Sequence, residues 1–187
     1  MGRPKLLLPW GVTSVLGHQL NAWQQLSAGQ VAVVCAGDAA MYAELDRLGF
    51  PLEQRILNPQ PERGMFSSIR CAAQWQGWAA GLTHWVISLG DQPHLRQTTL
   101  TALLIFSADF PESVCQPLAG RHRCHPVILP KAIFQRLAES PATTLRDFLA
   151  TCPGAAAGCV VEDPGLDLDI DTPADYERAW RLHLGAA

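Results

Sequence analysis

Short runs of apolar residues closed by glycine constrain the fold of this chain more than any other feature. Val31–Gly37 is one such run, and His84–Leu89 is another, followed by Gly90-Asp91-Gln92-Pro93. Runs without polar alternation are typical of strands that are buried on both faces of a parallel sheet. Similar patterns predict further strands at 113–117, 126–129 and 159–161, and a short, half-buried strand at 168–171.

Helical patterns fill the intervals between these strands. Apolar residues recur at helical spacing, and the predicted helices are 14–26, 41–48, 64–75, 98–106, 144–149 and 172–180. Thr98 is a candidate N-cap, and Thr172, Pro173 and Asp175 form a strong helix start. We expect Ala155–Gly158 to be a surface loop. The alternation of strands and helices predicts an α/β fold with a largely parallel sheet.

Composition excludes several classes of protein. The 187 residues carry 14 Lys and Arg against 17 Asp and Glu, a net charge of −3, so there is no basic excess for binding a nucleic acid backbone. The apolar stretches are shorter than the roughly 18 to 20 residues of a membrane span, and Pro9 interrupts Leu6–Leu8 before a signal peptide could form. The six cysteines lack zinc spacing, so we expect reduced thiols in a cytoplasmic protein.

Three aspartates are candidate ligands of a cation. Ligands of open α/β sheets bind beyond the carboxyl ends of strands, and Asp91 follows the apolar run that ends at Leu89. Asp169 and Asp171 are two residues apart in an extended segment, so they face the same side and need a nearby cation. Magnesium is commonly held by one or two carboxylates together with substrate phosphates. The alternatives are a turn-capping Asp91 and a solvated or helix-supporting Asp pair.

Three other places could bind an anion or an acceptor. Gly2-Arg3-Pro4-Lys5 puts two cations on one loop, which suits phosphate, although terminal cations are often only solvated. Gly64 begins a predicted helix with Ser67 and Ser68 in its first turn, where free N–H groups bind anions or serve only for capping. His125 precedes a strand and is either structural or functional. The chain contains no nucleophile elbow, no Walker lysine motif and no dinucleotide-binding fingerprint.

Five motifs occur in an order that resembles a known family. They are Gly2-Arg3-Pro4-Lys5-Leu6-Leu7-Leu8-Pro9, Gly64-Met65-Phe66-Ser67-Ser68, Leu89-Gly90-Asp91-Gln92-Pro93, His125-Pro126-Val127 and Asp169-Ile170-Asp171-Thr172-Pro173. Together they span nearly the whole chain. The chain resembles the MobA-like nucleotidyltransferases, and its third and fifth motifs look most similar to the molybdenum cofactor cytidylyltransferase branch.

The resemblance implies a fold and a reaction. The fold would be a Rossmann-like domain of the nucleotide-diphospho-sugar transferase type, with helices on both faces of the sheet, formed by residues 1–187 as a single domain. A phosphate of the acceptor would attack the α-phosphate of a nucleoside triphosphate in a Mg²⁺-dependent reaction, and pyrophosphate would leave. The donor would be CTP, with GTP as the second choice, and the acceptor would be molybdopterin. A molybdoenzyme or its chaperone is the protein partner that the resemblance allows, with no nucleic acid and no membrane.

The resemblance also implies roles for individual residues. Asp91 and Asp171 would bind the metal, and Lys5 and Asp91 would be catalytic. Nucleotide binding would involve the backbone and side chains of seven residues: Gly2, Arg3, Lys5, Gly64, Ser67, Ser68 and Asp91. Acceptor binding would involve Gln92, Pro93 and His125.

The sequence departs from the family at its beginning. Relatives start with a central strand and a glycine-rich phosphate loop, and Met1-Gly2 matches only the last two residues of that motif. We therefore expect the neighbouring strands either to lack partners or to pair with each other. Two alternative functions follow: a sugar-phosphate nucleotidyltransferase, or a non-catalytic nucleotide- or cofactor-binding homologue that has lost the phosphate loop.

Overall fold

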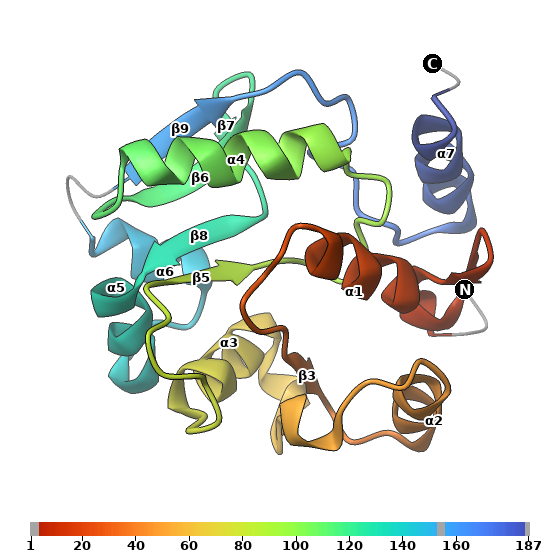
Figure 1. The fold of residues 1–187 in the computed structure, drawn as a ribbon, viewed down its shortest axis with the longest axis horizontal. Helices are drawn as coiled ribbons and strands as arrows, with labels where there is room; N and C mark the ends of the chain where they lie inside the picture. Colours follow the sequence, from red (N-terminus) through yellow and green to blue (C-terminus); the bar gives the residue numbers. More distant parts are fainter. Residues whose placement is uncertain (1–3, 153–155, 186–187) are drawn as a thin grey trace.

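The main sheet is built around two central strands in the C-terminal part of the chain. The computed structural model describes residues 4–152 and 156–185. The five strands of the sheet are β5 (His84–Ile87), β6 (Val114–Ala119), β7 (His122–Arg123), β8 (Val127–Pro130) and β9 (Ala156–Val160). β8 lies antiparallel between β5 and β6, and β9 pairs in parallel with β6. β5, β6 and β9 therefore share one direction (Figure 1).

A second, smaller sheet lies beside the first. β3 (Val33–Cys35) and β4 (Arg55–Leu57) pair in parallel, and no described strand joins β3 to β5. Direct pairing of β3 with β5, one of the two expectations, is not seen among the described strands: each has a partner strand on one edge only. A cavity of about 640 Å³ separates β3 from β5.

Helices cover both sides of the sheets, which confirms the predicted α/β class. The main sheet is mixed rather than largely parallel, because β8 and β7 run antiparallel to the strands they pair with. The helices are α1 (Val15–Gln25), α2 (Ala39–Arg47), α3 (Met65–Gln74), α4 (Gln97–Asp109), α5 (Lys131–Arg136), α6 (Leu145–Ala150) and α7 (Pro173–His183). Short 3₁₀ turns cover Lys5–Leu7, Leu52–Gln54, Pro61–Arg63 and Leu137–Glu139. α4 crosses β6 and β9 on one face, whereas α3, α5 and α6 lie on the other (Figure 1).

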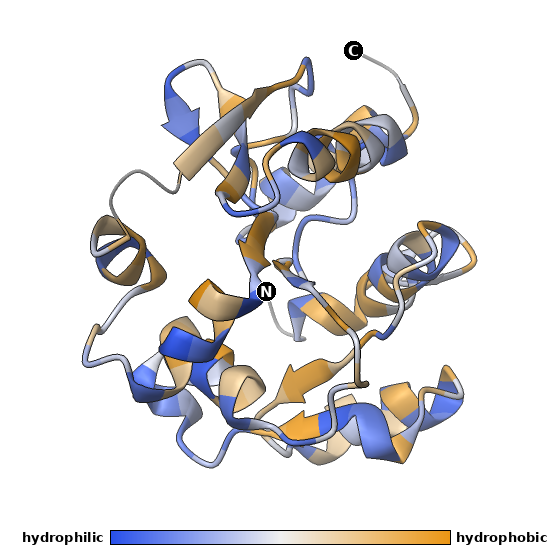
Figure 2. Cartoon of the chain, turned by 60° about the vertical axis from the view of Figure 1, so that its left-hand side comes forward, coloured by the Kyte–Doolittle hydropathy of each residue, from blue (hydrophilic) through white to orange (hydrophobic). Residues whose placement is uncertain are grey.

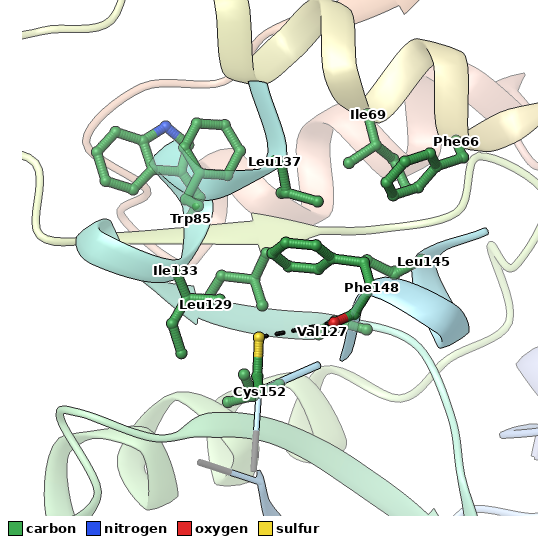
Figure 3. Packing of buried hydrophobic residues seen from close by; sticks show 12 residues of the cluster. Phe66, Ile69, Trp85, Val127, Leu129, Ile133, Leu137, Leu145, Phe148 and Cys152 are labelled. Atoms are coloured by element: carbon green, nitrogen blue, oxygen red, sulfur yellow. Dashed lines mark hydrogen bonds between the residues drawn. The ribbon is translucent and has the colours of Figure 1, made fainter. Parts of the chain in front are cut away.

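β8 shows how one strand serves two cores. Val127 and Leu129 pack with side chains of α3, α5 and α6 (Figure 3), and Ile128 packs with Leu103 of α4. Successive side chains of a strand point to opposite faces, so a continuous apolar run fills both layers. Several strands are accordingly hydrophobic along their length (Figure 2).

The N-terminal hairpin and the C-terminal helix form a separate apolar cluster. β1 (Pro9–Trp10) and β2 (Thr13–Ser14) pair antiparallel, and Trp10 packs edge-on against Trp180 of α7. α7 begins with the predicted capping box between Thr172 and Asp175. This cluster holds residues 168–170 beside the N-terminal segment because Leu168 and Ile170 are buried in it.

Three further sequence predictions are wrong. Residues 168–171 form no strand: the buried alternation is present, but the Ile170 N–H donates to the Asp91 carbonyl as an isolated contact. Thr98 does not cap α4. The carboxylate of Asp163, distant in sequence, accepts from the Arg96 N–H and the Thr99 hydroxyl and supports that helix start instead. Residues 156–158 belong to β9 rather than to a loop, while Ala155 lies outside the described residues.

Within the described parts of the chain, none of the helices has the length and apolar character that crossing a membrane requires.

Candidate active site

The loop after β5 places Asp91 where the N-terminal segment passes. Gly90 makes this close approach possible, because a Cβ at that position would lie 2.9 Å from a methyl group of Leu6. The neighbouring residue Lys5 is thereby brought to the same loop. Asp91 thus lies beyond the carboxyl end of β5, where open α/β sheets bind ligands.

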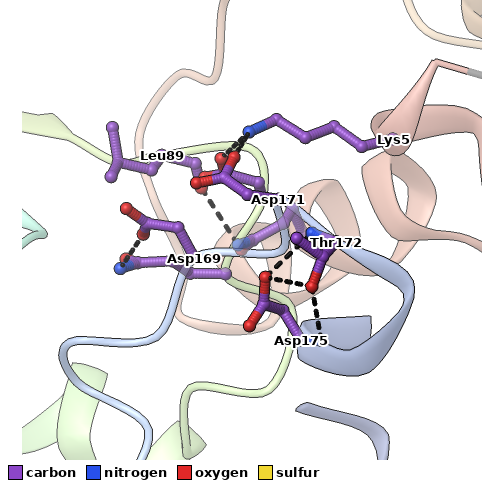
Figure 4. A network of polar contacts seen from close by, with 9 residues as sticks. Lys5, Leu89, Asp169, Asp171, Thr172 and Asp175 are labelled. Carbon is purple, nitrogen blue, oxygen red and sulfur yellow. Dashed lines mark hydrogen bonds and ion pairs between the residues drawn. The ribbon is translucent and has the colours of Figure 1, made fainter. Parts of the chain in front are cut away.

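Lys5 joins two carboxylates that are far apart in the sequence. Its ammonium group donates to Asp91 and, at 2.9 Å, to Oδ1 of Asp171 (Figure 4). The side chain of Asp91 is 14% exposed and that of Asp171 is 70% exposed. The ammonium group of Lys5 therefore bridges one largely buried carboxylate and one largely exposed carboxylate.

The charges of this cluster do not cancel. Two carboxylates and one ammonium group leave a net charge of −1 if all three are ionised. Burial by itself would lower the pKa of Lys5, but the hydrogen bonds and negative charges of Asp91 and Asp171 outweigh it, so this pKa is raised. Lys5 therefore stays protonated at neutral pH and is available to an anion.

The cluster fits a divalent cation that is held mainly by its substrate. Oxygen ligands from one or two carboxylates plus phosphates are typical of Mg²⁺, and Asp91 and Asp171 supply two such groups. No group of three or more His, Cys, Asp or Glu side chains suited to a metal occurs in the described part of the chain.

Polar contacts behind the cluster hold its loops in place. The Gln92 amide donates to Asp169 at 2.9 Å, and both Gln92 and Pro93 are buried. His94 is 2% exposed, and its Nε2 pairs with the Gly165 carbonyl at 2.9 Å. These contacts tie the loop after β5 to the segment that carries Asp171.

His125 lies two residues before the start of the neighbouring strand β8, next to the carboxyl end of β5. Its Nδ1 is 3.3 Å from the carbonyl oxygen of Ile87 in β5. Burial lowers the pKa of His125, and the hydrogen bond to Ile87 opposes this only in part. The ring is therefore mostly neutral at neutral pH, so it would meet a ligand as a hydrogen-bonding group rather than as a cation.

The start of α3 forms a second polar group. The buried Asn58 donates through its amide to the hydroxyls of Ser67 at 2.8 Å and Ser68 at 3.0 Å. Gly64 adopts a φ of 83° at the N-cap, a conformation that favours glycine. The Ser67 hydroxyl donates back to the Gly64 carbonyl. Both hydroxyls are thus positioned by the protein itself.

The predicted site residues fall into distinct places. Lys5, Asp91 and Asp171 are in contact. Ser68 lines the 640 Å³ cavity together with Leu6 and Gly90, whereas Ser67 lines a pocket of about 260 Å³ that also contains Arg63 and Arg70. Gly2 and Arg3 lie outside the described residues.

Sequence reasoning included Asn58 in the candidate segment that ends at Ser68 but gave it no role, and it did not single out His94. Asn58 directly follows β4, a strand that the sequence did not predict, and finding that strand would have marked Asn58 by the same carboxyl-end rule. His94 follows Pro93, and only its burial beside Gly165 distinguishes it from a surface histidine.

The family model for the MobA-like NTP transferase domain matches residues 1–156. The chain belongs to this family. A search of curated proteins gave no match.

Solved structures share the fold of this MobA-like chain. Rv0371c from Mycobacterium tuberculosis H37Rv is 25% identical with a TM-score of 0.72, covering 97% of this chain and 90% of that one. The same protein in complex with manganese is 27% identical with a TM-score of 0.65, covering 96% and 93%. Molybdopterin-guanine dinucleotide biosynthesis protein A from Archaeoglobus fulgidus is 14% identical with a TM-score of 0.69, covering 98% and 92%.

Proposed function

We propose that this MobA-like chain transfers a nucleoside monophosphate from a nucleoside triphosphate to a phosphorylated acceptor and releases pyrophosphate. The donor is CTP, with GTP as the second choice, and the acceptor is molybdopterin. The contact of Lys5 with Asp91 and Asp171 carries this proposal, because it gathers the groups needed to bind a triphosphate and a cation at the end of β5.

The residues of the chain act by positioning and by charge. Phosphoryl-type transfer needs alignment and neutralisation more than covalent help. Lys5 leaves its carboxylate partners and donates to phosphate oxygens of the donor. An acceptor phosphate oxygen then bonds to the α-phosphorus while the bond from that phosphorus to the pyrophosphate oxygen breaks. The attacking phosphate is largely ionised at pH 7, so no general base is required.

Asp91 and Asp171 are the proposed ligands of Mg²⁺. When bound, the ion would neutralise triphosphate charge. The manganese complex of the M. tuberculosis relative supports a divalent cation in this fold. We further propose that Gly64 and Ser68 lie against the nucleotide and that His125 lies near the acceptor. Gln92 and Pro93 are buried. We therefore propose that they contribute to acceptor binding by shaping the loop after β5.

The acceptor is proposed from the third and fifth motifs of the sequence. The A. fulgidus relative is named for molybdopterin-guanine dinucleotide biosynthesis, which is the same acceptor class. Its 14% identity supports the fold alone. The test below therefore varies both the acceptor and the base of the donor nucleotide.

The test is pyrophosphate release, measured with CTP or GTP, with or without molybdopterin, and with Mg²⁺ or a chelator. We expect Asp91→Asn to lower the rate about 100-fold or more, since an electrostatic group at the reacting phosphates is removed. Asp171→Asn should have a smaller effect because its side chain is 70% exposed. The control is Asp167→Asn, an exposed carboxylate in the same segment, which should keep the wild-type rate.

Two results would contradict the proposal. Unchanged turnover in Asp91→Asn would remove Asp91 as a metal ligand. Nucleotide binding by the wild-type protein, without turnover on any pairing of donor and acceptor, would support the non-catalytic homologue instead.

A further inference from the structure

Lys5 lies where a cation would bridge Asp91 and Asp171 (Figure 4). Its ammonium group donates to both carboxylates, and its distance to Oδ1 of Asp171 is 2.9 Å. In residues 4–152 and 156–185, neither carboxylate forms an ion pair with any other side chain. The ammonium group and a divalent cation therefore compete for the same two acceptors.

The two carboxylates are also held close together by contacts that do not involve the ammonium group. The Ile170 N–H donates to the Asp91 carbonyl at 3.3 Å, and the Gln92 amide donates to Asp169 at 2.9 Å. Ile170 is fully buried in the apolar cluster that the N-terminal hairpin forms with α7. If the ammonium group moved away, the two carboxylates would therefore remain neighbours.

Such a pair of carboxylates needs a positive charge beside it. The side chain of Asp91 is only 14% exposed, so water compensates its charge in part only. Two neighbouring carboxylates also repel each other unless a cation lies between them. Lys5 supplies that charge from a side chain that is 38% exposed, and this exposure allows it to turn toward another anion.

The position of Lys5 determines the charge that an arriving cation meets. The two ionised carboxylates carry −2 together, and the ammonium group between them reduces this to −1. A divalent cation that approaches both acceptors is also repelled by the ammonium group at close range. Binding of the cation alone therefore requires displacement of Lys5 from both of its partners.

We propose that Lys5 is an internal counter-ion that opposes cation binding until a triphosphate withdraws it. This inference rests on the proposed function, in which Lys5 donates to phosphate oxygens of the donor. Once the ammonium group contacts the triphosphate, Asp91 and Asp171 present their full charge to the cation. Donor and cation therefore bind with positive cooperativity, and by linkage each raises the affinity for the other.

The first test measures Mn²⁺ binding without nucleotide, from the electron paramagnetic resonance signal of the free ion. Lys5→Met keeps a long side chain and removes its charge, so we expect Mn²⁺ to bind about tenfold more tightly than in the wild type. The matched control is Lys131→Met, which removes the other of the two lysines, exposed at the start of α5, and should leave Mn²⁺ binding unchanged. Adding Asp91→Asn to Lys5→Met should abolish the gain, which assigns it to this site.

The second test follows the displacement of Lys5 in the wild-type protein. Lysine labelled with ¹³C at Cε gives one NMR signal for each of the two lysines, and the spectrum of Lys131→Met assigns them. We expect Mg²⁺ to shift the signal of Lys5 and to leave that of Lys131 in place. Inorganic tripolyphosphate without metal should also shift the Lys5 signal. This measurement keeps the inference testable if Lys5→Met does not fold.

Three results would overturn the inference. Equal or weaker Mn²⁺ binding by Lys5→Met would show that Lys5 does not compete with the cation. A Lys5 signal that Mg²⁺ leaves unchanged would show the same in the wild type, and one that tripolyphosphate leaves unchanged would show that phosphate does not withdraw the ammonium group. Neither test measures turnover. A chain that binds nucleotide without transferring it could pass both, and an active transferase could fail both, so pyrophosphate release judges the proposed function separately.

Discussion

Two apolar strands that look alike in the sequence have different surroundings in the structure. Val127–Pro130 forms β8, lies between two strands, and is buried at every position. The run at 31–34 leads into β3, has a strand on one side only, and is half-buried throughout. The difference shows that hydrophobicity alone does not bury a strand: burial also depends on a neighbour at each edge.

The largest expected effect tests this contrast with one substitution at two places. Val127→Ala removes methyl groups from a fully packed site and should cost about 2 kcal/mol of unfolding free energy. Val34→Ala makes the same change beside the cavity and should cost about 1 kcal/mol or less. Both lose the same strand propensity, so chemical denaturation compares packing alone. Equal losses would mean that the cavity is filled in solution.

Sequence patterns predicted the elements that depend on neighbouring residues better than they predicted the others. The run at 84–89, the loop at Asp91 and the capping box of α7 were predicted because each depends on neighbouring residues. β4 was missed because Arg55–Leu57 has only one fully buried residue and no apolar run. α5 was missed because it follows β8 with no connecting residue.

The candidate site was predictable only in part for the same reason. Carboxyl-end position marked Asp91, but its contact with Lys5 spans 86 residues and no spacing rule connects them. The family resemblance assigned both residues to one site but did not predict this contact. At the start of α4, Asp163 rather than Thr98 accepts the capping hydrogen bond. This is likewise a tertiary contact, formed across 67 residues.

The next prediction concerns the pH dependence of stability through His94, which is buried in the loop after β5. Burial lowers the pKa of His94 below its ordinary value of 6.5, and the hydrogen bond to Gly165 opposes this only in part. Nδ1 of His94 is buried without a partner among the described residues, so protonation there would bury an unpaired charge. The unfolded chain then binds the proton more readily, and stability is complete above about pH 6.5 and falls as the pH drops below it.

The slope of this loss is at most about 1.4 kcal/mol per pH unit for one histidine. The measurement is unfolding free energy between pH 7 and pH 5 for the wild type and for His94→Gln, whose amide can still donate to Gly165. We expect the variant to have the shallower dependence, with the remainder due to His125 and other groups. Identical slopes in the two proteins would show that His94 titrates normally and that the loop after β5 is more open than the structure shows.

The smallest expected effect is a gain in stability, and we expect it only for a substitution that lines the cavity. Ala72 and Ala73 are neighbours on α3, and both pack against the main core, but only Ala72 lines the cavity. Ala72→Leu should fill part of that space and add about 0.5–1 kcal/mol of stability. Ala73→Leu has the same helix propensity and the same added volume, but it meets packed neighbours and should give no gain. Thermal unfolding of the pair isolates the cavity from every other property of the helix. Equal changes of stability in the two variants would mean that the cavity beside Ala72 does not accommodate the added methyl groups.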